Sequence, residues 1–205
     1  MPPADAGRHR TGAARRRRPG GTFLSDPTGR LVHDDIRSEP GGAVIGEPRA
    51  ADLDLVDLES ALLRAAVGDY AVEAAVLLLA NSGQWLPRLQ AAGLIAIALD
   101  GDAADGGPWA AVQWADLDAA LRTGAIAGSG GELRLLRAAA SLADGQPIDL
   151  ADLTAGLDRP ELVLLLAALS HAAGSHEHRA VVRDGEGVPH AGATLGPVVP
   201  WPTHD

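Results

Sequence analysis

Three histidines near the end of an apolar segment are the residues whose type and spacing come closest to a chemical site. His171, His176 and His178 follow the apolar run that starts at Leu162. Imidazole nitrogens bind zinc, but this spacing fits no standard zinc pattern, and no carboxylate is fixed nearby. His171 falls in the last turn of a predicted helix, where a partial positive charge is favourable. We therefore predict no metal site here.

A serine nucleophile is the second chemical possibility. Ser170 and His171 are neighbours in the sequence, and on a helix such neighbours point to different faces. The chain also contains no G-x-S-x-G elbow of the kind that exposes a catalytic serine. The carboxylates are too numerous for one pair to stand out as acid and base. The sequence therefore predicts no catalytic residue and no cofactor, and a small hydrolase with unidentified carboxylates is kept as an alternative.

Two glycine-rich segments resemble ligand-binding loops without completing the pattern. The segment 100–107 is rich in Asp and Gly, but an EF-hand would need oxygen ligands where Ala104 and Ala111 stand. The segment 124–131 leads into a predicted helix N-terminus, which can hold an anion. Glu132 in the first turn would repel a phosphate. We interpret the first segment as a solvated turn and the second as a helix cap.

The composition excludes several kinds of chemistry. All 17 basic residues are arginine, and the 205-residue chain contains no cysteine. Without lysine, a Schiff base, a pyridoxal-phosphate anchor and a Walker phosphate loop are excluded. Without cysteine, a thiol nucleophile, a disulfide and an iron–sulfur cluster are excluded. The length fits one main folded domain, since domains average roughly 150 residues.

The spacing of apolar residues and capping residues predicts a mainly α-helical domain with a small two-stranded β element. Asp54, Ser129, Asp149 and Asp158 are placed to cap helices, and Ser129 and Asp158 are each followed by Glu at the third helical position. Asp116 is a further candidate cap, for a helix over 117–123. The predicted helices cover 55–66, 69–81, 86–92, 117–123, 130–144, 150–156 and 159–173, and the predicted strands cover 94–99 and 110–114.

The two ends of the chain differ from this central domain. Residues 1–48 are rich in Arg, Gly and Pro and predict a disordered leader, and residues 176–205 predict a Gly/Pro-rich disordered tail around the helical domain 49–175. The basic run Arg15–Arg18 is followed by no apolar stretch of signal-peptide length. No apolar run reaches the roughly 18 residues of a membrane span. We therefore expect a cytoplasmic protein without a membrane partner.

The last three predicted helices follow the order of a helix-turn-helix, and the strand-like segment 179–183 could serve as a wing. Arg159, Arg179 and Arg183 would then be the DNA-binding residues, together with the basic leader. The electrostatics argue against this interpretation. Residues 50–175 carry six Arg against seventeen Asp and Glu, and this negative charge would repel phosphates. A degenerate winged-helix regulator is therefore the alternative, and binding to nucleic acid is not the favoured prediction.

The final predicted helix is apolar on nearly every side. Such a helix must be covered on more than one face, either in the centre of the core or by a partner. The candidate interface residues are Leu162, Leu165, Leu166 and Leu169. The favoured prediction is a non-catalytic accessory or regulatory protein that acts by contacting another protein or a second copy of itself.

One part of the chain resembles a known group of sequences. The runs 129–133, 138–143, 147–150, 156–159 and 171–174 resemble a block found in a family of small uncharacterised proteins of high-GC bacteria. The resemblance covers about residues 129–174, and no activity is known for that family. It implies a genuine folded domain and transfers no site residue to this chain.

Overall fold

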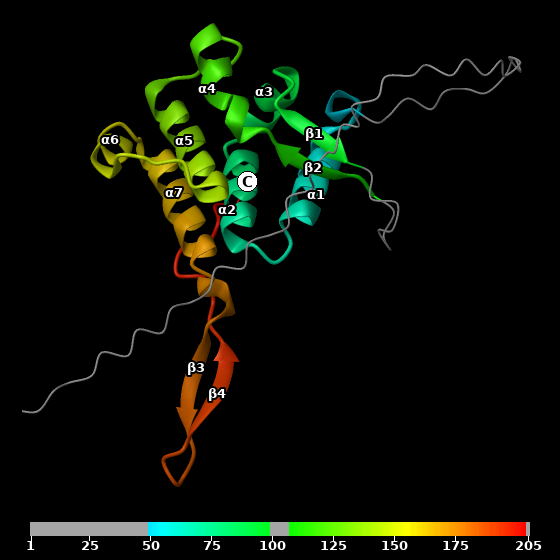
Figure 1. The fold of residues 1–205 in the computed structure, drawn as a ribbon. Helices are drawn as coiled ribbons and strands as arrows, with labels where there is room; N and C mark the ends of the chain where they lie inside the picture. Colours follow the sequence, from blue (N-terminus) through cyan, green and yellow to red (C-terminus); the bar gives the residue numbers. More distant parts are fainter. Residues whose placement is uncertain (1–48, 99–106, 204–205) are drawn as a thin grey trace, which may run out of the picture. The chain divides into compact units, whose positions relative to one another are not determined.

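The computed structural model describes residues 49–98 and 107–203, all of which belong to the unit Ile45–Asp205. The leader predicted over 1–48, including Arg15–Arg18, lies outside the described residues. Most of the segment 100–107 also lies outside them. The fold within the described unit is mainly helical, with two small two-stranded sheets (Figure 1).

The elements follow one another in an order that repeats. Three helices and a hairpin are followed by a linking helix and then by three further helices and a second hairpin. The α-helices are α1 (Leu55–Ala66), α2 (Tyr70–Asn81), α3 (Trp85–Ala91), α4 (Trp114–Thr123), α5 (Gly130–Asp144), α6 (Leu150–Ala155) and α7 (Arg159–Ala172). The 3₁₀ helices are η1 (Ala50–Asp52) and η2 (Ser175–Glu177), and the strands are β1 (Ile95–Ala98), β2 (Trp109–Val112), β3 (Arg179–Arg183) and β4 (Pro189–Thr194).

Four predicted caps, Asp54, Ser129, Asp149 and Asp158, begin described α-helices. Asp69, which the sequence places inside its helix, is the N-cap of α2. At α1, for example, the Asp54 carboxylate accepts a hydrogen bond from the Asp57 N–H at 2.8 Å. The Asp116 cap is a wrong prediction, because α4 starts at Trp114 and Asp116 lies within its first turn. Trp114 packs partly buried against the core, so tertiary packing extends this helix beyond its polar start signal.

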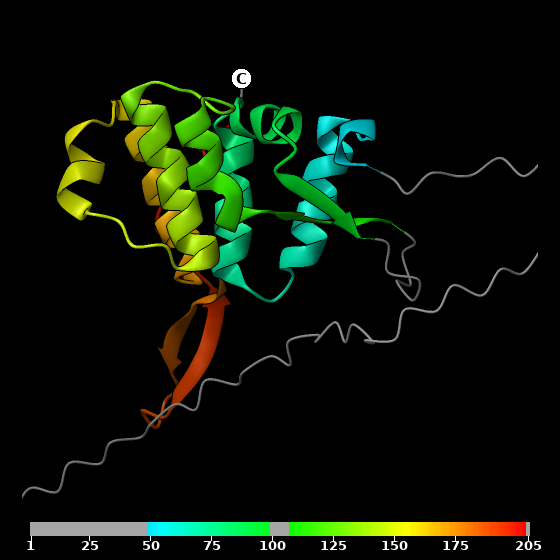
Figure 2. The same cartoon turned by 45° about the horizontal axis from the view of Figure 1, so that its top comes forward.

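Helix α2 is the centre of the helical core. It lies between α1 on one side and α5 and α7 on the other in both views (Figures 1 and 2). Ala74, Ala75 and Leu78 are almost fully buried because neighbouring helices cover α2 on several sides. The small alanines allow these helices to approach closely. The helix that must be buried all round is therefore α2, whereas α7 packs at the edge of the core.

The first hairpin is part of the core. Strands β1 and β2 are antiparallel, with Ile95 opposite Val112 and Ala98 opposite Trp109. Helix α1 packs on this hairpin, and Ile95 and Ala110 are buried beneath it. The two strands predicted over 94–99 and 110–114 are thus confirmed as β1 and β2, although β2 ends at Val112 and Trp114 belongs to α4. The structure describes the first strand as far as Ala98.

The disordered tail predicted for residues 176–205 is corrected by the structure. Strands β3 and β4 form an antiparallel hairpin, with Arg179 opposite Thr194 and Arg183 opposite Pro189. Residues 196–203, which we name the C-terminal strap, then return to α7. Pro and Gly end strands and make turns without preventing a hairpin between them, which is why composition alone gave the wrong expectation.

Candidate interaction surface

Helix α7 has strong local signals at both ends. The Asp158 carboxylate accepts from the Glu161 N–H at 2.8 Å, and the Glu161 carboxylate accepts from the Asp158 N–H at 2.9 Å. This capping box satisfies two donors that a helix start leaves unpaired. Gly174 follows the helix with φ of 67°, a conformation that glycine adopts without a steric penalty. Residues next to α7 in the chain therefore set where this helix begins and ends.

The two faces of α7 differ in burial. Leu165 is 3% exposed and packs in the core, whereas Leu162, Leu166 and Leu169 are 40%, 42% and 47% exposed. The spacing of the exposed leucines, with intervals of four and three residues, places them on one face of a helix with 3.6 residues per turn. We name these three residues the leucine stripe. The prediction that Leu165 belongs to an interface is wrong, because α2 and α5 cover that side of α7.

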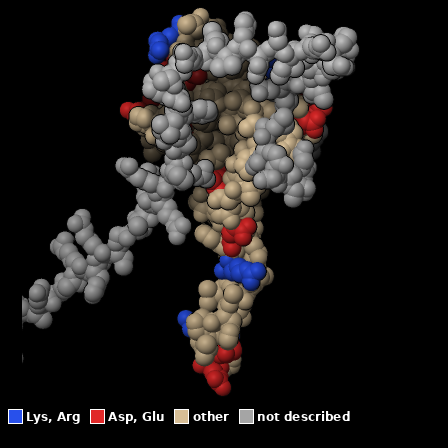
Figure 3. Space-filling view, turned by 45° about the vertical axis from the view of Figure 1, so that its right-hand side comes forward, with Lys and Arg blue, Asp and Glu red and all other residues tan. Residues whose placement is uncertain are grey.

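The β3–β4 hairpin is exposed on both faces. The side chains of Val181 and Val182 point to opposite faces of the hairpin, because they are successive residues of β3, and they are 71% and 54% exposed. In Figure 1 the hairpin extends from the end of α7, and Figure 3 shows uncharged surface between the charged groups at its base and its tip. A two-stranded hairpin alone is only marginally stable in water, and its open edges can pair with another chain.

The hairpin turn and base are both held by hydrogen bonds. At the turn, Asp184 accepts from His190 at 2.7 Å and from the Val188 N–H at 2.9 Å. The His190 hydrogen bond is the main reason that the pKa of Asp184 lies below its usual range. At the base, the Leu195 N–H donates to the His178 carbonyl at 2.7 Å. These contacts fix the hairpin's shape and leave its two faces open.

The C-terminal strap joins the hairpin to α7 through two buried serines. The Oγ atoms of Ser170 and Ser175 are 2.7 Å apart. The Val199 N–H donates to Ser170 at 3.0 Å, and the Val198 N–H donates to Ser175 at 3.3 Å. No sequence pattern pointed to this contact, although a serine on the buried side of an apolar helix requires a hydrogen-bond partner.

The histidines form an aromatic cluster beside the strap. His171 stacks on His176 with ring centroids 4.4 Å apart, and its Nε2 lies 3.2 Å from a Glu73 carboxylate oxygen. Tyr70 meets both rings edge-on, and Trp201 of the strap lies 6.2 Å from the His171 ring. Within residues 49–98 and 107–203, no three His, Asp or Glu side chains are grouped as a metal site. The cluster packs the strap against α7 and α2.

An apolar hollow of about 400 Å³ lies at the other end of α7. Pro160, Val163 and Leu164 contribute one wall from α7, and Pro202 of the strap contributes another. Arg159 and Asn81 lie at its polar side. The half-exposed Val163 lines this hollow and lies three residues before Leu166, so the two side chains are neighbours on the surface of α7.

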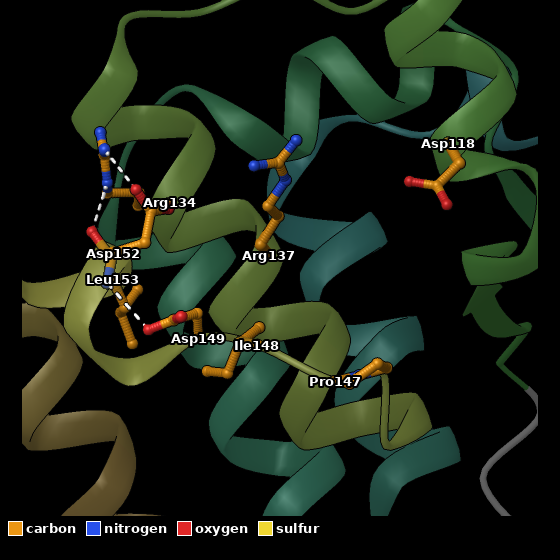
Figure 4. A pocket seen from close by; sticks show the side chains of 8 residues that line it. All are labelled: Asp118, Arg134, Arg137, Pro147, Ile148, Asp149, Asp152 and Leu153. Carbon is orange, nitrogen blue, oxygen red and sulfur yellow. Dashed lines mark hydrogen bonds and ion pairs between the residues drawn. The ribbon is translucent and has the colours of Figure 1, made fainter.

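A second hollow of about 400 Å³ is polar and lies among α4, α5 and α6 (Figure 4). The Arg134 guanidinium in this hollow donates two hydrogen bonds to Asp152, one to the side-chain carboxylate at 2.9 Å and one to the backbone carbonyl at 2.7 Å. Asp149 accepts from the first N–H groups of α6 as its cap. Arg137 and Asp118 lie at the exposed side without a dashed line joining them in Figure 4. Most of the charge in this hollow therefore has a structural role.

The glycine-rich segment 124–131 acts as a helix cap, as predicted. The Ser129 hydroxyl accepts from the Glu132 N–H, and the Glu132 carboxylate accepts from the Ser129 N–H at 2.7 Å. This backbone hydrogen bond is the largest reason that the pKa of Glu132 is lowered, and Arg88 contributes from 3.2 Å. A carboxylate occupies the place that a bound phosphate would need.

The arginines of the winged-helix alternative are exposed but separated. Arg159 begins α7, whereas Arg179 and Arg183 lie on β3 beyond the other end of that helix, about 20 Å away at 1.5 Å per residue. Arg183 donates to the Gly187 carbonyl at 2.8 Å within the turn. The order α6, α7, β3, β4 fits a winged helix, but the face that α7 presents to solvent carries leucine instead of groups that bind base edges.

Comparison of the chain with family models, with curated proteins and with solved structures finds no match. The resemblance of residues 129–174 to a bacterial family therefore stays a prediction. Among the described residues, no helix has the length and apolar character needed to cross a membrane.

Proposed function

We propose that this chain is a non-catalytic interaction protein that binds an apolar protein surface through α7 and the β3–β4 hairpin. The observation that carries the proposal is the leucine stripe, three half-exposed leucines on the outer face of a helix whose inner face is fully packed. Contiguous exposed apolar surface of this kind is typical of protein contact sites.

The distribution of apolar side chains supports the proposal. Nine of the sixteen large exposed hydrophobic residues among the described residues lie after residue 158. They belong to α7, to the hairpin with its flanking residue Leu195, and to the strap, so this part of the chain carries more than half of the large exposed hydrophobic residues that the structure describes. Single exposed apolar residues need no explanation, but this concentration does. The members are Leu162, Val163, Leu166, Leu169, Val181, Val182, Val188, Leu195 and Val198.

Site-specific photo-cross-linking tests the proposal in cells that express the full chain. A photoreactive phenylalanine analogue in place of Leu166 should give a covalent product whose second component mass spectrometry identifies as a protein. The same analogue in place of Val56, which is 72% exposed on α1, is the matched control and should give none. The product should disappear in the L162R/L169R background. Absence of any product from position 166 would refute the proposal.

The winged-helix alternative predicts a different result in a gel-shift titration of the full chain. DNA binding should then fall steeply with salt and should be lost in the R159A/R179A/R183A variant. Binding that persists in this variant would come from elsewhere in the chain and would not support a reading role for α7.

A further inference from the structure

The C-terminal strap lies in a groove that follows α7 beside α2. At the end of α7, two backbone N–H groups of the strap donate to the buried hydroxyl groups of Ser170 and Ser175. The Trp201 ring then lies beside that of His171, with 6.2 Å between the ring centroids, and Pro202 lines the hollow near the start of α7. Figure 1 shows the strap in red as it returns past α7 toward α2. We name this surface the strap groove and define it by Val163, Leu164, Ser170, His171 and Ser175.

The strap has the composition of a segment that binds in an aromatic-lined groove. It contains Pro197, Pro200 and Pro202, and Trp201 stands between the last two. Proline fixes one backbone angle, so such a segment loses less conformational freedom when it binds. Grooves with aromatic side chains recognise proline-rich segments for this reason. The strap groove offers the His171 ring for packing and serine hydroxyl groups as hydrogen-bond acceptors, so its chemistry suits such a segment.

The strap fits its groove incompletely at two neighbouring positions. The indole N–H of Trp201 is buried and makes no hydrogen bond within residues 49–98 and 107–203, and a buried donor without an acceptor costs free energy. Next to it in the chain, Pro202 forms one wall of the apolar hollow of about 400 Å³ and leaves that hollow unfilled. Apolar walls without a neighbour forgo van der Waals contacts. A proline-rich segment with a longer apolar side chain at the position of Pro202 would therefore fit the groove better than the strap does.

We propose that the strap groove binds a proline-rich segment of a second protein, and that the strap is an internal ligand which this segment displaces. The groove does not include the leucine stripe, so the inference goes beyond the proposed function. The strap of a second copy is a less suitable occupant, because it would bring the same unpaired indole N–H and leave the same hollow unfilled. It would also lose translational and rotational freedom that the internal strap does not lose. A different segment with a larger apolar residue offsets that cost by filling the hollow.

The covalent attachment of the strap sets how strongly another segment must bind. A tethered ligand acts at an effective concentration that is about millimolar for a short flexible linker. A segment with the strap's own sequence therefore competes poorly with the strap of the unmodified chain. The W201A variant removes the ring that packs beside His171 and should leave the groove more accessible.

Fluorescence anisotropy of two labelled peptides measures binding to the full chain. One peptide has the sequence of residues 196–203, and the other has the same sequence with the P202L substitution. Both should bind the W201A variant at least about tenfold more tightly than the unmodified chain, because the internal competitor is weakened. The P202L peptide should bind W201A at least about threefold more tightly than the first peptide, because its leucine enters the hollow. W109A, which removes a 39% exposed tryptophan from β2, is the matched control and should bind both peptides as the unmodified chain does.

A second substitution locates the bound peptide. Val163 lines the hollow and is 36% exposed, so V163R in the W201A background should place a charged side chain there. This variant should lose the advantage of the P202L peptide. V56R on α1, in the same background, is the matched control and should keep the advantage, because Val56 is 72% exposed and lies outside the groove. Circular dichroism checks that each variant keeps its helix content.

The unmodified chain gives a test that does not depend on the folding of any variant. A saturating concentration of the P202L peptide should move the indole N–H resonance of Trp201 toward the position of a solvent-exposed indole. The resonance of Trp85, which is fully buried in the core, should stay in place. If W201A does not fold, this displacement of Trp201 alone decides the inference.

Three results would overturn the inference. The first is that neither peptide binds a folded W201A variant and the Trp201 resonance of the unmodified chain does not move. The second is binding to W201A without an advantage for P202L, or with an advantage that V163R leaves unchanged, because the hollow would then play no part. The third is a dimer of the unmodified chain that is lost in W201A, since the occupant would then be a second copy. The photo-cross-link at position 166 tests the leucine stripe separately, so failure here leaves the proposed function standing.

Discussion

The two buried serines that hold the C-terminal strap should be essential to its attachment. Ser170 and Ser175 are 7% and 5% exposed, and their hydroxyl groups bond to each other and to backbone N–H groups of the strap. The S170A variant would leave the Ser175 hydroxyl and the Val199 N–H without their present partner. Both groups lie where water has limited access, so replacement bonds are restricted.

The magnitude follows from the number of bonds lost. Leaving a buried polar group unsatisfied costs about 1–3 kcal/mol. In a chain of about this length each kcal/mol of lost stability lowers the Tm by about 2–4 °C. We therefore expect S170A to lower the Tm by about 2–12 °C. S175A should have a smaller effect because its strap bond is longer, at 3.3 Å, and the double variant should lose less than the sum because the shared bond is removed only once.

Thermal unfolding monitored by circular dichroism and hydrogen exchange at the strap amides would measure these effects. Exchange at Val199 should accelerate in S170A, while exchange in the core of α2 should not change. The control is S60A on α1, because Ser60 is half-buried and makes no side-chain hydrogen bond among the described residues. If S170A matched S60A in both Tm and exchange, the proposed anchoring of the strap by this serine pair would be refuted.

Three further predictions concern α5 and α7. L165A should cost about 2–5 kcal/mol in urea unfolding because Leu165 is buried, whereas the exposed neighbour in L166A should cost well under half as much. G174A should destabilise by about 1–2 kcal/mol in the same assay, because φ at Gly174 is positive. The lowered pKa of Glu132 means that its ionised form stabilises the fold above the usual carboxyl pKa and that this stability is lost as pH falls through the lowered value. E132Q, which keeps an acceptor, should therefore flatten the stability profile below about pH 5, and an unchanged profile would show that the Ser129 bond does not depend on charge.

The helices of this fold were largely predictable because their start signals are local. A cap such as Asp158 and the glutamate three residues later interact with their own backbone, and the structure contains that capping box. The start of α4 was not predictable in this way. Trp114 is the first residue of α4 and its side chain packs against the core. This packing is a long-range contact, so the residues next to Trp114 in the sequence do not predict it.

The direction in which an apolar helix faces depends on long-range packing. Helices α2 and α7 both have apolar residues around most of their circumference, so periodicity does not show which of them is central. The structure buries α2 and leaves one side of α7 open. For the same reason Leu165 and Leu166 were equivalent in the sequence but differ in burial. Ser170 and Val199 of the strap are 29 residues apart in the sequence, so no local sequence pattern predicts the hydrogen bond between them.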